Sequence, residues 1–211
     1  MVASAGLLFA AVPNVVAEVD ALVNMLRPPT QRALAMAGSA FTPARSFISK
    51  EEYLRSCLDV PKSLDVLLRP ATERSGLLAA CRDTARAVQA EMPTYALPYL
   101  VEADVSAALG ESFAVALERA RDLAPHVHWL ADRRVVLARA RMAQLDDVGR
   151  AGFERDLAEL FGSAEGRRAL AMHYLRWPDM RERLTNLAEA ASHEVQRDFL
   201  AKVRQQAGGG S

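Results

Sequence analysis

The apolar residues of this chain recur every three or four positions and hardly ever alternate with polar ones. This spacing places side chains on one face of an α-helix, whereas one face of a strand takes every second residue. Alanine, leucine and arginine are abundant, and Ile48 is the only isoleucine, a composition that favours helices over strands. The sequence therefore predicts an all-α fold. It includes one long last helix from Asp179 to Gln206, with apolar positions at Met180, Leu184, Leu187, Ala191, Val195, Phe199 and Val203.

Length and charge narrow the classes of function. The 211 residues suffice for one sizeable core or two small ones, and a composition that is 51% apolar excludes general disorder. The 26 basic and 26 acidic residues balance, so the chain has no overall attraction to nucleic acid or to an anionic membrane surface. We therefore expect no nucleic-acid partner.

The first 26 residues are predominantly apolar. An uncharged run from Val2 to Val12 is followed by Pro13 and by a second apolar stretch from Val15 to Val23. The run is shorter than the roughly 20 residues that span a bilayer, and the first basic residue is Arg27, unlike a signal peptide. The end of a membrane anchor, the remnant of a signal sequence and a buried helix all remain open. We favour an anchor or membrane-proximal helix over residues 1–26, at the periplasmic side of an inner membrane.

The remaining sequence divides into a linker, a helical region and a tail. Residues 27–48 are rich in proline, threonine, serine and glycine, as linkers are. A helical domain is predicted over residues 49–206, with Ser49 and Glu52 forming a capping box at its first helix. Proline and glycine separate its helices, so we expect antiparallel helical hairpins in an α-solenoid-like array. The end of the chain, residues 207–211, has the composition of an appended flexible linker.

One hairpin carries a recognisable pattern. Gly110 follows a predicted helix that ends at Leu109, and Pro125 ends the next helix, in which Leu117 and Ala120 take packing positions. This segment resembles the second helix of a tetratricopeptide-type repeat, in which helix, glycine turn and helix precede a proline. The resemblance implies a scaffold domain tethered to the bacterial envelope, which binds another envelope protein and needs no catalysis and no cofactor.

Aromatic and arginine side chains on or beside this hairpin are the candidates for partner binding, because such groups dominate the binding energy of protein interfaces. The candidates are Tyr95, Tyr99, Trp129 and Arg133. Core packing is the competing interpretation of the aromatic residues, and a peptide-holding groove between helices is the functional one. Arg133 and Arg134 also form a basic pair, for which a solvated helix face is expected.

Cys57 and Cys81 are the only cysteines, and no spacing typical of a zinc or haem site occurs. Both lie in predicted helices that a short segment joins, so we predict that they are close enough to bond. A disulfide would indicate an oxidising compartment. Two buried free thiols are the alternative.

The sequence offers little catalytic chemistry. His126, His128 and Asp132 are the only local group of metal-ligand types, but side chains two positions apart diverge on a helix. We therefore expect surface imidazoles at a helix start and no metal site. The rival hypothesis is an all-α enzyme or small-molecule binder that uses residues from distant helices. Its candidate residues are Glu102, Asp104, His173 and His193.

Overall fold

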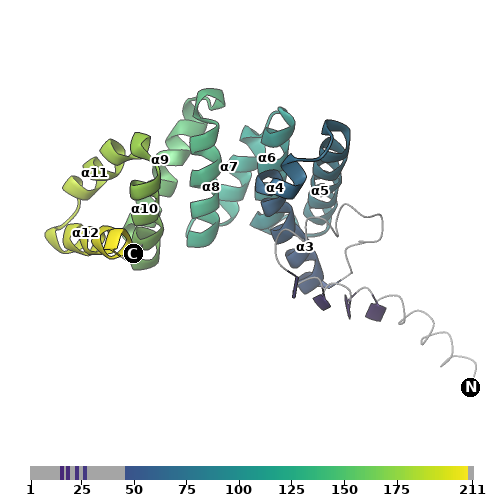
Figure 1. Cartoon of the computed structure of the whole chain (residues 1–211), viewed down its shortest axis with the longest axis horizontal. Helices are drawn as coiled ribbons and strands as arrows, with labels where there is room; N and C mark the ends of the chain where they lie inside the picture. Colours follow the sequence, from purple (N-terminus) through teal and green to yellow (C-terminus); the bar gives the residue numbers. More distant parts are fainter. Residues whose placement is uncertain (1–14, 17, 20–21, 24–25, 28–45, 209–211) are drawn as a thin grey trace, which may run out of the picture. The chain divides into compact units, whose positions relative to one another are not determined.

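The computed structural model describes part of the N-terminal segment and nearly all of the helical region. The described residues are 15–16, 18–19, 22–23, 26–27 and 46–208. Every regular element in these ranges is a helix, which confirms the all-α prediction (Figure 1). Within the same ranges, no helix is both long and apolar enough to cross a membrane. The apolar run from Val2 to Val12 and the predicted linker between residues 28 and 45 lie outside the described residues.

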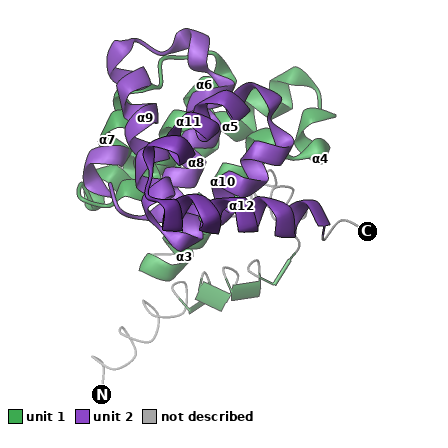
Figure 2. Cartoon of the chain, turned by 90° about the vertical axis from the view of Figure 1, so that its left-hand side faces the viewer, with its two compact units in different colours: residues 1–120 green, residues 121–211 purple. Residues whose placement is uncertain are grey.

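The helices form two compact units, residues 1–120 and residues 121–211 (Figure 2). The boundary falls inside α7 (Ala114–Leu123). The boundary between the units lies inside the helical domain that we predict over residues 49–206. Apolar periodicity marks the face that a helix buries but not the helix that covers it, which is why the sequence did not indicate the division.

Unit 1 is built on three longer helices with a short connection. Its elements are α3 (Phe47–Asp59), η1 (Val60–Lys62), α4 (Leu64–Leu67), α5 (Ala71–Glu91), α6 (Ala96–Leu109) and the first part of α7. Helix α5 packs along α6, and α3 packs against both. The apolar faces of these helices form the core of the unit, which includes Leu54, Leu78, Leu97, Val101 and Leu117.

Helix α3 starts earlier than the sequence predicts. Ser46 is its N-cap, and its hydroxyl accepts a hydrogen bond from the backbone N–H of Ser49 at 3.2 Å. The predicted capping box of Ser49 and Glu52 is therefore wrong, because Ser46 offers the same hydroxyl three residues earlier. The carboxylate of Glu18 accepts from the N–H and the hydroxyl of Ser46, at 3.0 and 2.5 Å. A negative charge thus lies at the positive end of α3, where it stabilises the helix.

Two sequence features of unit 1 have clear structural roles. A disulfide joins Cys57 of α3 to Cys81 of α5, with the Cα atoms 5.7 Å apart. The two cysteines are therefore close enough to bond, as predicted, and are not free thiols. Gly110 ends α6 with a φ of 78°, in the left-handed region that glycine adopts without strain. The predicted end of this helix at Leu109, with Gly110 directly after it, is confirmed.

Unit 2 is a cluster of five helices after the last turn of α7. They and the two 3₁₀ turns are α8 (His128–Ala140), η2 (Met142–Gln144), α9 (Asp147–Gly162), α10 (Ala164–Arg176), η3 (Pro178–Met180), α11 (Arg181–Ala190) and α12 (His193–Gly208). Helix α9 packs against α8 and α10, and α10 also packs against α12. Asp146 and Ser163 cap α9 and α10 through their side chains. The core includes Val135, Phe153, Leu157, Leu170 and Phe199.

The single last helix predicted from Asp179 to Gln206 is wrong. The chain forms α11 and α12 instead, separated at Ala191, whose ψ of 168° is extended. The carbonyl of Ser192 accepts from the N–H of Gln196 at 2.9 Å, and its hydroxyl accepts from the N–H of Val195 at 3.5 Å. Serine is a strong N-cap residue, so this local start of a new helix competes with continuation of the old one.

Candidate functional site

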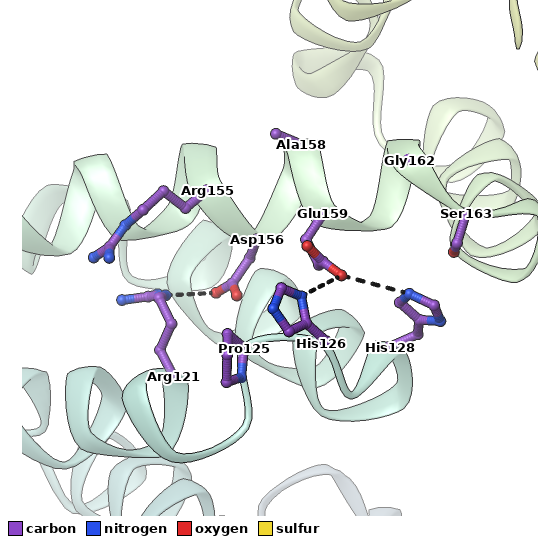
Figure 3. A pocket seen from close by; sticks show the side chains of 10 residues that line it. All are labelled: Arg121, Pro125, His126, His128, Arg155, Asp156, Ala158, Glu159, Gly162 and Ser163. Carbon is purple, nitrogen blue, oxygen red and sulfur yellow. Dashed lines mark hydrogen bonds and ion pairs between the residues drawn. The ribbon is translucent and has the colours of Figure 1, made fainter.

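The candidate site is a pocket of about 630 Å³ in unit 2, formed by the last turn of α7, the loop before α8, and α9 (Figure 3). Its lining residues are Arg121, Pro125, His126, His128, Arg155, Asp156, Ala158, Glu159, Gly162 and Ser163. The volume lies within the range of about 300–1,000 Å³ that is typical of small-ligand pockets. Six of the ten lining residues have charged or imidazole side chains, and two of these, Arg121 and Asp156, are almost fully buried.

A buried group of charges forms one wall of the pocket. The carboxylate of Asp156 is 2% exposed and accepts from Arg134 at 2.8 to 3.2 Å and from Nε of Arg121 at 2.9 Å. The side chains of Arg121 and Arg134 are 4% and 0% exposed. Buried charges need partners of opposite sign, and here two guanidinium groups share one carboxylate. Nη1 of Arg134 also donates to the carbonyl of Ala124 at 3.2 Å, which fixes the loop before α8.

His128 lies at the end of the pocket opposite Arg121, and His126 lies between His128 and Asp156 (Figure 3). Nδ1 of His126 is 3.0 Å from Oε1 of Glu159, and Nε2 of His128 is 3.7 Å from the same oxygen (Figure 3). Our expectation that these imidazoles diverge is therefore wrong. Val127 between them is extended, with φ −90° and ψ 95°, and alternate residues of an extended backbone point to the same side.

The two converging imidazoles and Glu159 are not arranged as ligands of one metal ion. Across the part of the chain that the structure describes, no group of three or more histidine, cysteine or acidic side chains is arranged to hold a metal ion. The imidazoles instead share the carboxylate of Glu159, which is 29% exposed. Figure 3 shows the guanidinium groups of Arg121 and Arg155 toward the other end of the pocket. Planar guanidinium forks match carboxylate and phosphate oxygens.

Two of the residues predicted to bind a partner lie in unit 1. Tyr95 is half-buried, and its ring lies 5.1 Å from that of Phe47. Burial, with a contribution from the charge of Glu51, raises the pKa of Tyr95 to about 12. Tyr99 is also half-buried, its hydroxyl donates to the carbonyl of Pro93 at 3.2 Å, and the guanidinium of Arg119 lies 6.0 Å from the centre of its ring. Both rings therefore contribute to packing within the unit.

The other two predicted partner-binding residues, Trp129 and Arg133, lie on α8 in unit 2, and both are half-buried. Trp129 lines a smaller cavity of about 140 Å³, together with residues that include His128 and Asp132. Arg134, in contrast, has no exposed side-chain surface, so the expectation of a solvated pair with Arg133 is wrong for Arg134. The four candidates are thus divided between the units, and neither unit gathers all of them on its surface.

Two carboxylates of the rival enzyme hypothesis, Glu102 and Asp104, are engaged in ion pairs. Glu102 accepts from Arg86 and from Gln89, each at 2.7 Å. Asp104 is 8% exposed and accepts from Lys62 at 3.1 Å. These contacts connect neighbouring elements of unit 1 and give both carboxylates a structural role.

His173 takes part in a stacked arrangement in unit 2. Its Nε2 lies 2.6 Å from Asp132, and its ring stacks on Trp177 with the ring centres 3.9 Å apart. The guanidinium of Arg139 lies 4.4 Å from the centre of the Trp177 ring and donates to Asp179 at 2.9 and 2.7 Å. These hydrogen bonds hold the pKa of Asp179 below its usual value. The arrangement joins α8 to the end of α10. His193, the last residue of the rival set, begins α12.

The sequence analysis named His126 and His128 but missed the buried charges beside them, Asp156 of the pocket lining and its partner Arg134, although a signal was present. Arg134 lies four positions from both Leu130 and Ala138, which are buried, and therefore takes a core-facing place on α8. Asp156 stands in the same relation to Phe153 and Leu160 on α9, three and four positions away. A charged residue at a core-facing position of each of two helices indicates a buried ion pair.

Comparisons with known proteins assign neither a family nor a function to the chain. The chain matches no protein-family model, no curated protein and no solved structure. The arrangement of its side chains is therefore the basis for inferring function.

Proposed function

We propose that this chain is a non-catalytic helical domain that binds another protein of the bacterial cell envelope. The observation that carries the proposal is a group of large apolar side chains exposed on unit 1. Leu64, Leu67 and Leu68, in the connection between α3 and α5, are 66%, 47% and 77% exposed. Phe47 and Ile48 are exposed as well, but they lie at the start of α3, whereas the three leucines follow its end. Grouped apolar side chains at the surface are typical of interaction sites.

The ion pairs made by the candidate catalytic residues support a protein-binding domain rather than an enzyme. Of the four residues named for a site assembled from distant helices, three are paired: Glu102 with Arg86, Asp104 with Lys62 and His173 with Asp132. The glycine that ends α6, a few residues before α7 begins, is the feature that supports a scaffold with tetratricopeptide-like hairpins in an α-solenoid-like array. Such arrays present surfaces for protein partners.

The compartment forms part of the same proposal. The disulfide between Cys57 and Cys81 is typical of oxidising compartments such as the periplasm. The apolar runs Val2–Val12 and Val15–Val23 support a tether at the periplasmic side of the inner membrane. Exposed side chains in the second run, Val15 at 60% and Leu22 at 56%, leave apolar surface for a membrane or a partner.

Capture of partners from a detergent-solubilised envelope fraction, followed by mass spectrometry, tests the proposal. We expect a Leu64→Ser/Leu68→Ser double variant to capture the partner about tenfold less than the wild type at unchanged melting temperature. Val115→Ser is the matched control, because Val115 is 82% exposed and lies on α7. Equal capture by the wild type and the double variant would exclude these leucines as the binding surface. Failure of the wild type to enrich any envelope protein over a bead control would overturn the proposal itself.

A further inference from the structure

A different pocket of unit 2, of about 250 Å³, lies between α10, α11 and α12, and we call it the α11–α12 pocket. The chain leaves α11 through the extended Ala191 and then begins α12, so the two helices diverge from this junction (Figure 1). Nε2 of Gln196 holds the junction, because it donates to the carbonyls of Glu189 and Ala191 at 3.2 and 3.4 Å. The lining residues are Tyr174, Thr185, Ala188, Glu189, Gln196, Phe199, Leu200 and Val203.

The interior of the α11–α12 pocket is aromatic and apolar. The rings of Tyr174 and Phe199 meet edge to face, with their centres 6.0 Å apart and an angle of 87° between their planes. Phe199 is 2% exposed and belongs to the core, whereas Leu200 beside it is 47% exposed. Aromatic rings at these positions pack favourably against a further ring. Since an apolar cavity of about 150 Å³ can hold benzene, the pocket has room for one ring with a short chain.

The charge of the α11–α12 pocket is negative and unpaired. Among the described residues that line it, Glu189 is the only charged one. Glu189 is exposed, and its carboxylate makes no hydrogen bond or ion pair with any residue that the structure describes. Arg181 lies 5.9 Å from the centre of the Tyr174 ring, but it donates to the carbonyls of Tyr174 and Leu175 and is not part of the lining. The pocket thus combines an apolar interior with one available carboxylate.

We propose that the α11–α12 pocket binds a small aromatic amine in its protonated form. The ring packs against Tyr174, Phe199 and Leu200, and the ammonium group lies beside the carboxylate of Glu189. Burial of the ring supplies most of the affinity. The carboxylate supplies the specificity, because it attracts a cation and repels an anion of the same shape. This inference concerns a different surface from the exposed leucines of unit 1 and does not depend on the proposed protein partner.

Two-dimensional NMR titration of the whole chain at neutral pH tests the site with three probes that differ in one end group. Phenethylamine carries a positive charge, phenethyl alcohol is neutral and phenylpropionate carries a negative charge. We expect the amine to shift the backbone amide signals of the lining residues, with a dissociation constant on the order of 1 mM for a ligand of this size. The alcohol should bind about threefold more weakly, as the loss of one exposed ion pair predicts, and the carboxylate more weakly still.

Two variants separate the charge from the apolar interior. Glu189→Gln should weaken binding of the amine about threefold and leave binding of the alcohol unchanged. Glu182→Gln is its matched control, because Glu182 is an exposed glutamate on α11 outside the lining. Leu200→Ala should weaken binding of both probes about fivefold through lost apolar contact. Met172→Ala is its control, since Met172 is 46% exposed on α10 and is also outside the lining.

The outcomes decide the proposal directly. It would be overturned if the amine left the signals of the lining residues unshifted, or if the wild type bound the amine no more tightly than the alcohol. Equal weakening of amine binding by Glu189→Gln and Glu182→Gln would also exclude the assigned ion pair. Thermal unfolding of each variant checks that it is folded, and the comparison of the three probes on the wild type needs no variant.

Discussion

Replacement of Asp156 by alanine measures what the buried charges of unit 2 contribute to stability. The Asp156 carboxylate is 2% exposed and lies between Arg121 and Arg134, whose side chains are almost fully buried. Truncation removes the partner that both guanidinium groups share. Removal of one member of a buried ion pair typically costs about 3–5 kcal/mol, because the remaining charge stays out of water. We expect a loss of that size in the free energy of unfolding.

Urea denaturation followed by circular dichroism gives the free energy, and thermal unfolding provides a second measure. For a chain of this size, about 2–4 °C per kcal/mol corresponds to a fall in melting temperature of about 10 °C. Asp122→Ala is the matched control, because Asp122 is an exposed aspartate on α7, and it should change stability by less than about 0.5 kcal/mol. A loss below about 1 kcal/mol for Asp156→Ala would refute the role given to these charges.

Replacing all three charged residues tests the same reasoning from the other direction. A variant with Arg121→Met, Arg134→Leu and Asp156→Leu leaves no buried charge in this group. Apolar replacements of a whole buried ion cluster are often neutral or stabilising. We therefore expect the triple variant to be more stable than Asp156→Ala, measured by the same urea titration.

Three further predictions concern individual features of the fold. Cys57→Ser/Cys81→Ser should lower the free energy of unfolding by about 3 kcal/mol, and mass spectrometry of protein from the periplasm should find no free thiols. Gly110→Ala should destabilise by about 1 kcal/mol because its φ is 78°, whereas Gly76→Ala, inside α5 with open space at its Cβ, should stabilise by about 0.5–1 kcal/mol in the same urea assay. The folded-state pKa of Asp179 is lowered, so its ion pair stabilises the fold above the ordinary pKa of aspartate and is lost as the pH falls through the lowered value. Below about pH 4, the wild type should therefore lose more stability than Asp179→Asn, as measured by unfolding at a series of pH values.

The class of fold and the end of α6 could be predicted because their signals are local. Gly110 after α6, Ser163 before α10 and the apolar face of α5 all act within a few residues of the chain. The break at Ala191 was missed because the apolar spacing continues across it, while Ser192 starts a new helix through its own hydrogen bonds. Where periodicity and capping compete, the sequence alone does not show which prevails.

The candidate site was less accessible to prediction because it depends on contacts between helices. Arg134 and Asp156 are 22 positions apart, and only the packing of α8 on α9 brings them together. The convergence of His126 and His128 depends on one extended residue just before a helix, which an assumed helical geometry conceals. The charged residues at core-facing positions were the signal that sequence reasoning could have used.

The stacking of Trp177 between His173 and Arg139 has a practical consequence for measuring the two units separately. The chain has two tryptophans, Trp129 and Trp177, and both belong to unit 2. Tryptophan fluorescence consequently follows the unfolding of unit 2, whereas the far-ultraviolet signal follows the helices of both units. If the two transitions coincide, the units unfold cooperatively. If the fluorescence changes first or last, each unit has a stability of its own that can be measured in the intact chain.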